Sequence, residues 1–120
     1  MIKLEFFIKK SSVQQEEELI FLRFVIENKL FSFPTGLSVP EKAWDKNRQE
    51  MNKTFPNSWL TNAKLAIITK ITQDYLLGKK SFERENLGEL KEEISNVLKT
   101  LKQPEEVYSY CMKNEIIEGH

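Results

Sequence analysis

Positively charged and aromatic side chains are interleaved in the first thirty residues of the chain. Phe21 and Arg23 lie two apart in an apolar run, and Lys3, Lys9 and Lys29 lie toward the ends of the flanking segments. In an extended strand, residues two apart point to the same side. A guanidinium is a rigid fork of N–H donors that suits paired acceptors, and an aromatic ring offers apolar contact area. These residues therefore indicate a binding surface.

Residue types that make and break bonds are scarce. His120 is the only histidine, Cys111 is the only cysteine, and the four glycines are isolated. They cannot form a zinc site of the usual kinds, a nucleophile–base pair or a phosphate-binding glycine loop. Cys111 is expected to be a packing residue, and adjacent glutamates fit solvated helix faces. We therefore expect a protein that is not an enzyme, with no metal, no cofactor and no small-molecule substrate.

The overall composition is that of one folded domain, with room for a helical extension. The 120 residues are 40% hydrophobic and 30% charged, with four glycines and four prolines. No apolar run approaches the roughly 18 residues of a membrane span. Residues 1–8 alternate where a signal peptide would be continuously apolar. Because a single cysteine also fits a reducing compartment, we expect a cytoplasmic protein with no membrane partner.

The net charge of zero conceals an asymmetry along the chain. Residues 1–80 carry 13 Lys and Arg against 9 Asp and Glu, a net charge of +4. Residues 81–120 carry 5 against 9, a net charge of −4. On charge alone, solvated faces without a partner explain this pattern. A directional partner, however, responds to local charge, so an anionic ligand would contact only the basic part.

Three segments predict a small antiparallel sheet. Residues 2–9 alternate in polarity, residues 19–27 are nearly continuously apolar, and residues 30–38 form the third segment. The second segment is the best candidate for the central strand. Asn28 tolerates positive φ and predicts a tight turn before the third strand. Pro34 cannot donate a ladder hydrogen bond, so the third strand should lie at an edge or break there.

An ordered connector and a first helix follow the sheet. The connector, residues 39–55, has no clear period, and its Trp44 should pack against the sheet. A helix is predicted over residues 58–77, with Asn57 or Ser58 as its N-cap. Gly78 occupies the position of a C-terminal cap. The apolar stripe of this helix consists of Leu60, Ala63, Ile67, Ile68, Ile71 and Tyr75.

Further helices are predicted in the C-terminal part. Asn86 followed by Glu89 is typical of a helix start with Asn86 as the N-cap, and an apolar stripe then continues to about Leu101. Pro104 either ends this helix or opens a short third one that includes residues 107–116. The elements predict an α+β fold: a three-stranded antiparallel sheet packed on one face by a helix, followed by one or two further helices. The expected domains are residues 1–80, with the sheet and the first helix, and residues 81–120, a helical linker or the start of a core-binding domain.

Four segments follow one another in a distinctive order: residues 20–25, the turn at Asn28, residues 33–36 and residues 39–45. Their most specific parts are the pair Thr35 and Gly36 and the pair Trp44 and Asp45, at this spacing. This order resembles the N-terminal arm-type DNA-binding domain of tyrosine recombinases, the integrases of mobile elements such as conjugative transposons. The resemblance covers roughly residues 2–100.

The resemblance implies sequence-preferring binding of double-stranded DNA at arm-type sites, with the open sheet face in the major groove. Arg23 would contact guanine, and Phe21 could contact a thymine methyl group. The phosphate contacts would come from Lys3, Lys9, Lys29, Lys42, Lys46 and Arg48. Other domains or protomers of a recombinase assembly would be further partners. The chain is then expected to be a non-catalytic fragment or a truncated relative of a recombinase.

Three alternatives stay open. Arg23 can pair across the strands with Glu5 on the same face, which by sequence alone is as well supported as a base contact. The open sheet face and the apolar stripe of residues 87–101 can instead bind another protein. A positive face would favour DNA, whereas an apolar or mixed-sign face would favour a protein partner. A complete enzyme would require a coding sequence that continues past His120.

Overall fold

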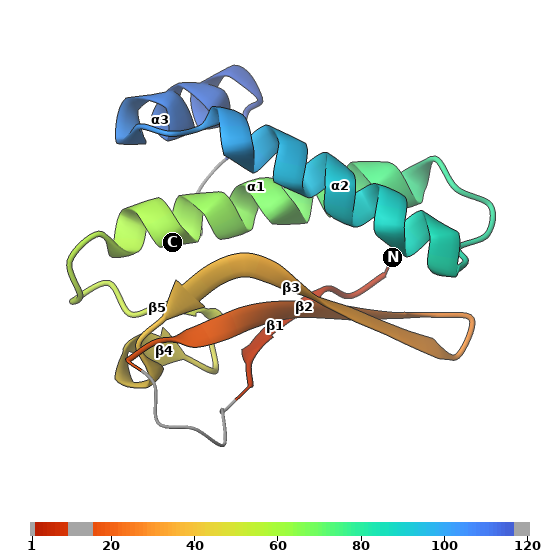
Figure 1. Ribbon diagram of the computed structural model, residues 1–120, viewed down its shortest axis with the longest axis horizontal. Coiled ribbons are helices and arrows are strands. Elements are labelled where there is room, and N and C mark those ends of the chain that lie inside the picture. The colour runs from red at the N-terminus through yellow and green to blue at the C-terminus, as the bar shows by residue number, and fades with distance from the viewer. Residues whose placement is uncertain (1, 10–15, 117–120) are drawn as a thin grey trace. The chain divides into compact units, whose positions relative to one another are not determined.

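The structure, a computed structural model, describes residues 2–9 and 16–116 and confirms the α+β class. Three antiparallel strands precede a short 3-10 helix, a small hairpin and three α-helices (Figure 1). The chain divides into two compact units, residues 1–58 with the strands and residues 59–120 with the helices. None of the helices in the described ranges is long and apolar enough to cross a membrane.

The main sheet has the strand order β1-β2-β3, so the predicted central strand is confirmed. The first strand begins three residues later than its alternating pattern. Glu27 and Asn28 form the turn between β2 and β3 with φ angles of 51° and 67°. Two positive φ values fit a two-residue type I′ turn, which confirms the role expected of Asn28. The strands are β1 (Glu5–Ile8), β2 (Glu18–Ile26) and β3 (Lys29–Val39).

β3 lies at an edge of the sheet and continues through Pro34. Of the two predicted alternatives, the edge position is therefore confirmed and the break at Pro34 is not. The register of the β2–β3 pair shifts just beyond this proline. Phe21 pairs with Pro34, whereas Leu19 pairs with Ser38. Ile20 therefore faces three residues of β3, which makes a bulge of two extra residues.

Thr35 and Gly36 form this bulge. The Thr35 hydroxyl is buried, donates to the carbonyl of Ile20 at 2.7 Å and accepts the N–H of Leu37 at 3.1 Å. It thus provides hydrogen bonds where the strand ladder is interrupted. Gly36 has a φ of 87°, a conformation that strains residues with a side chain. The backbone at the bulge therefore requires this residue pair.

The two faces of the sheet differ in burial. One face presents aliphatic and aromatic side chains that are at most 7% exposed, and its Phe24 and Phe31 rings stack with centroids 5.8 Å apart. Burial of such side chains supplies most of the stabilisation available to a small sheet. The opposite face is half-buried or exposed. The buried set on β2 and β3 is Ile20, Leu22, Phe24, Phe31 and Phe33.

The connector contains a hairpin that the sequence pattern did not reveal. A 3-10 helix, η1 (Glu41–Ala43), comes first in the connector. The hairpin follows, with the strands β4 (Trp44–Asp45) and β5 (Glu50–Met51). The Gln49 side chain in its loop accepts the backbone N–H of Phe6 at 2.9 Å, which fixes the loop beside β1. Trp44, expected to pack against the sheet, is half-buried in β4.

The three helices are α1 (Ser58–Leu77), α2 (Arg84–Thr100) and α3 (Pro104–Lys113). Pro104 opens the third helix, as one alternative required. One cap prediction was wrong. The N-cap of α2 is Glu83, whose N–H donates to the side chain of Asn86 at 2.8 Å, so Asn86 lies inside the helix. Gly78 directly follows the last residue of α1, at the predicted cap position, but without the positive φ of a left-handed cap.

The helical unit buries a regular set of apolar side chains. They recur at helical spacing along each helix, as an amphipathic stripe requires. Cys111 is buried among them, which fits the expected packing role. The stripe predicted for α1 omitted Leu65, which is also buried. The most buried members are Ala63, Leu65, Ile67, Ile68, Leu90, Ile94 and Val107.

Candidate nucleic-acid interface

The less buried side of the sheet, here called the open face, carries Phe21, Arg23 and Val25 of β2, beyond the register shift at Ile20. Antiparallel pairing places the side chains of all three strands next to one another on it, in rows that cross the sheet. The central row joins Glu5, Arg23 and Ser32. The open face consists of Glu5, Phe7, Phe21, Arg23, Val25, Leu30, Ser32 and Pro34.

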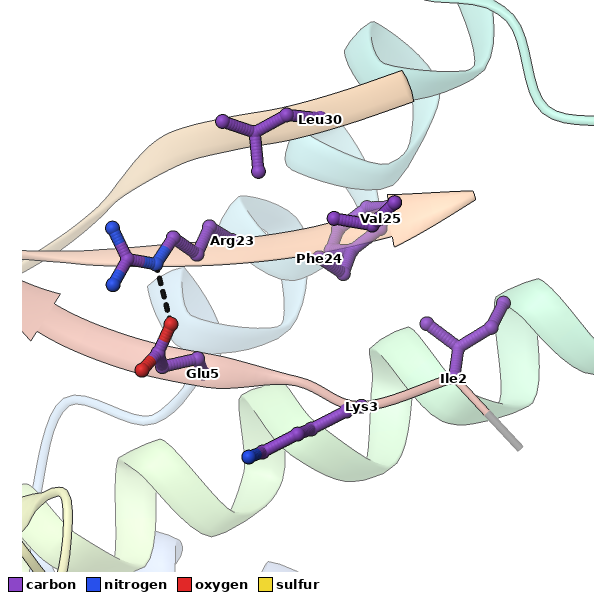
Figure 2. A pocket seen from close by; sticks show the side chains of 7 residues that line it. All are labelled: Ile2, Lys3, Glu5, Arg23, Phe24, Val25 and Leu30. Carbon is purple, nitrogen blue, oxygen red and sulfur yellow. Dashed lines mark hydrogen bonds and ion pairs between the residues drawn. The ribbon is translucent and has the colours of Figure 1, made fainter. Parts of the chain in front are cut away.

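Arg23 lies in the middle of the open face and is held by two neighbours from β1. Its Nε donates to Oε1 of Glu5 at 2.5 Å (Figure 2). Its guanidinium carbon lies 4.3 Å from the centroid of the Phe7 ring. The cross-strand pair with Glu5 that the sequence left open is therefore formed. Because only Nε is used, the two terminal nitrogens have no partner within the part of the chain that the structure describes. The Arg23 side chain is 41% exposed, so these donors face solvent.

Glu5 is a carboxylate surrounded by positive charge. The hydrogen bond from Arg23 is the main cause that lowers the pKa of Glu5. Burial opposes it, and the charges of Arg23, Lys3 and Lys46 lower the pKa further. Glu5 is therefore ionised throughout the neutral range. The cluster of Glu5 with Arg23, Lys3 and Lys46 carries a net charge of +2, counted from these four residues.

An aromatic stack continues from Arg23 along the open face. The rings of Phe7 and Phe21 are 5.5 Å apart and inclined by 25°, and the ammonium of Lys9 lies 5.8 Å from the Phe21 centroid. A cation therefore lies at each end of a pair of stacked rings, Arg23 over Phe7 and Lys9 over Phe21. Each cation is attracted by the negative face of its ring. Phe21 is half-buried, because its ring is engaged by Phe7.

The other predicted basic residues lie around the sheet rather than on it. Lys29 is exposed at the start of β3, beside the turn, and Lys42 is exposed in η1. Lys46 and Arg48 are exposed in the β4–β5 loop, where the carboxylate of Asp45 accepts the Arg48 N–H at 3.0 Å. The structure thus gathers Lys3, Lys46 and Arg23 about Glu5, while Lys29 and Lys42 lie apart.

A pocket of about 350 Å³ opens on the hairpin end of the open face. Figure 2 shows the Arg23–Glu5 pair and Lys3 on one side and Val25 and Leu30 on another. Val25 and Leu30 are cross-strand partners and are 53% and 66% exposed. The lining residues are Ile2, Lys3, Glu5, Arg23, Phe24, Val25 and Leu30.

Sequence reasoning missed several contributors to this surface. The alternation of residues 2–9 places Phe7 on the same face as Lys3 and Lys9, but it gives no sign that the Phe7 ring contacts Arg23 and Phe21. Val25 and Leu30 become neighbours only once the register of the hairpin is known. Gln49 gave no local signal, because its contact to β1 joins residues 43 positions apart.

No described group of three or more His, Cys, Asp or Glu residues is arranged to hold a metal ion. The arrangement suits recognition of an anion with planar or apolar parts: exposed guanidinium donors, surrounding ammonium groups, stacked rings and an apolar pocket. A three-stranded sheet with a cationic and aromatic open face defines a binding domain of the type that contacts nucleic acid.

Comparison with known families gives this domain type its name. The profile of the arm DNA-binding domain matches residues 6–91, which is most of the chain. The chain therefore belongs to the arm DNA-binding domain family, the arm-type DNA-binding domains of tyrosine recombinases and integrases. No curated protein and no solved structure matches the chain.

The family agrees with the resemblance drawn from residues 20–45. Double-stranded DNA is accordingly the ligand class of this domain, in the context of recombination. The match begins within β1 and ends within α2, so it includes residues of both compact units.

Proposed function

We propose that the open face enters the major groove of double-stranded DNA and binds arm-type sites with sequence preference, as the accessory module of a site-specific recombinase. Family membership supports DNA as the ligand. The dimensions support the groove: neighbouring strands are about 4.8 Å apart, and a major groove about 12 Å wide admits a two-stranded ribbon. Residues 81–120 are proposed to be a linker toward further recombinase domains or protomers.

The observation that carries the proposal is the fixed orientation of Arg23. Glu5 and Phe7 restrain its guanidinium while its terminal nitrogens remain exposed. A restrained guanidinium loses less conformational entropy when it binds, which favours bidentate contact with O6 and N7 of guanine. The ion pair with Glu5 is thus compatible with a base contact, because it leaves the distal nitrogens for the base.

The surrounding cations are proposed to contact phosphates. Lys3, Lys46 and Arg48 lie beside β1, and Lys9 and Lys29 lie near strand ends, so the backbone of a duplex on the open face would be within their reach. Such contacts position the protein and do not read sequence. Each neutralised phosphate should contribute about −0.9 to the slope of log affinity against log salt. Lys42 is proposed as a further phosphate contact, although it lies in η1, apart from the cations around Glu5.

The experiment uses the full 120-residue chain and a randomised duplex library, from which bound sequences are selected. Fluorescence anisotropy then compares the selected duplex with a scrambled one over a salt series. Arg23→Ala should weaken binding to the selected duplex by about 5-fold to 150-fold, equivalent to about 1–3 kcal/mol. Arg23→Lys should lose most of the same preference, since an ammonium is not bidentate.

Arg84→Ala is the matched control, because Arg84 is an exposed arginine at the start of α2 and removes the same charge. It should leave the preference between the two duplexes unchanged. Binding that does not respond to salt, or an Arg23→Ala variant that keeps the full preference, would exclude the base-reading role.

One observation favours a second candidate, binding of another protein. The open face is mixed in sign and partly apolar, with Glu5 beside Arg23 in its central row and with Val25 and Leu30 exposed. This is the composition that the sequence argument associated with a protein partner. The library selection decides between the two functions, because a protein-binding face would give no enriched DNA sequence.

A further inference from the structure

The apolar half of the pocket has no role in the contacts proposed so far. Val25 and Leu30 form a cross-strand pair on the open face, are 53% and 66% exposed, and share the pocket with Ile2. Isolated exposed aliphatic side chains are ordinary, but these line one pocket directly beside the Arg23–Glu5 pair (Figure 2). The pocket therefore combines an apolar wall with a wall of hydrogen-bond donors.

We propose that Val25 and Leu30 receive the 5-methyl group of a thymine and make this end of the sheet a specificity determinant. The inference rests on the proposed function, in which the open face lies in the major groove. The thymine methyl is the apolar group that a base pair exposes there. Lys3 and Arg23 at the border of the pocket complement a polyanion, which supports DNA as the occupant.

The spacing along β2 fixes where this thymine should be. Val25 is two residues from Arg23 on the same face, and an antiparallel strand rises about 3.4 Å per residue, so the two side chains are about 7 Å apart along the strand. One DNA strand also advances about 3.4 Å per nucleotide. For a strand that follows the groove, a methyl group at the pocket belongs to a base about two pairs from the guanine at Arg23.

The exposure of the apolar residues distinguishes this pocket from Phe21, the other candidate for thymine contact. The Phe21 ring stacks on Phe7 and lies beneath the Lys9 ammonium, so it is already partly covered. Val25 and Leu30 have more surface to bury on binding. Burial of one methyl group contributes about a fourfold gain in affinity, calculated from the value for a buried CH₂ group.

The test replaces thymine by deoxyuridine, which removes the methyl group and keeps the hydrogen-bonding edge. Sequences selected by the full chain are titrated with deoxyuridine at each thymine in turn. One position, about two pairs from the guanine whose preference disappears in Arg23→Ala, should weaken binding about fourfold. Val25→Thr and Leu30→Thr should lose this methyl effect, because a hydroxyl replaces part of the apolar wall.

Leu19→Thr is the matched control, since Leu19 is also an exposed aliphatic residue of β2 but lies at the opposite end of the strand. It should retain the methyl effect. A library without any enriched sequence would overturn the proposed function together with the inference. An enriched guanine that depends on Arg23, but no methyl effect at this spacing or an unchanged effect in Val25→Thr, would overturn the inference alone.

Discussion

The two faces of β2 are built from alternate residues of one nine-residue strand, yet they meet different demands. Ile20, Leu22 and Phe24 are at most 2% exposed, whereas Phe21, Arg23 and Val25 on the other side keep much of their surface. The first set contributes apolar burial to folding. The second set contributes donors, rings and an apolar pocket that folding leaves accessible. Adjacent positions in this strand can therefore change stability or recognition separately.

Replacement of a ring on the buried face should have the largest effect. Phe24→Ala removes a side chain that is 2% exposed and that stacks on Phe31, so we expect it to lower the free energy of unfolding by about 3–5 kcal/mol. Phe21→Ala, three residues earlier in β2 and on the half-buried side, should lower the free energy of unfolding clearly less. Urea denaturation followed by circular dichroism measures both variants. Equal losses would contradict the division between the two faces.

The bulge in β3 should show the next largest effect on stability. Thr35→Val keeps the shape of the side chain but removes the hydroxyl that bonds Ile20 and Leu37, which leaves buried backbone groups without their partner. We expect a loss of about 1–3 kcal/mol in the same denaturation experiment. Ser32→Ala on the open face of β3 is the control and should change stability by less than about 0.5 kcal/mol. A neutral Thr35→Val would show that the bulge does not depend on this hydroxyl.

Glu5→Gln should affect recognition more than stability, since the Glu5 and Arg23 side chains are 39% and 41% exposed. The variant keeps an acceptor oxygen for Arg23 but weakens its hold, because it removes the negative charge, which also repels phosphate. Affinity for scrambled DNA should therefore rise, and the preference for the selected duplex should fall by less than in Arg23→Ala. Anisotropy with both duplexes measures the two changes. Unchanged preference would show that the charge of Glu5 is not needed to orient the guanidinium.

The lowered pKa of Glu5 sets the pH range of this effect. The folded pKa of this carboxylate lies below its ordinary value of about 4.3. Its interaction with Arg23 is therefore fully present above about pH 4.3 and is lost as the pH falls through the folded pKa. Discrimination by the unmodified protein should accordingly be constant from pH 8 to pH 5, in the same titrations. A decline within that range would contradict the assignment to Glu5.

Lys46→Ala should have the smallest effect. It removes one positive charge beside the Glu5 cluster, so the salt slope should fall by about 0.9, equally for selected and scrambled duplexes. Lys70→Ala is the control, because Lys70 is an exposed lysine of α1 whose ammonium lies 3.4 Å from the Asp74 carboxylate. A change of preference in Lys46→Ala would indicate a base contact instead of a phosphate contact.

Local patterns predicted the parts of the fold that depend on local chemistry. Alternation located the first strand and a nearly continuous apolar run located the central one. The Asn28 turn followed from its tolerance of positive φ, and apolar periodicity located the helices. The β4–β5 hairpin was missed because its two-residue strands are too short to show a period. Asn86 was misassigned because an asparagine can cap a helix from outside or bond back from its first turn. The packing of α1 on the sheet stays a prediction.

The candidate site could be predicted only in part from the sequence, because its contacts join residues on different strands. Arg23 and Glu5 could be placed on one face, but the choice between pairing and base contact depends on geometry across strands. In the structure the pair forms through Nε and leaves the terminal nitrogens exposed. The pocket beside them required the register of β2 and β3, which no single segment encodes.

The contact between Gln49 and β1 also has a consequence for self-association. Outer strands with unpaired N–H and C=O groups can add further strands from other molecules, which leads to aggregation. On β1 the Gln49 side chain already occupies the N–H of Phe6, and on β3 Pro34 has no N–H to offer. Both edges of the three-stranded sheet thus carry an obstacle to strand addition, so the open face can stay uncovered while sheet extension is disfavoured.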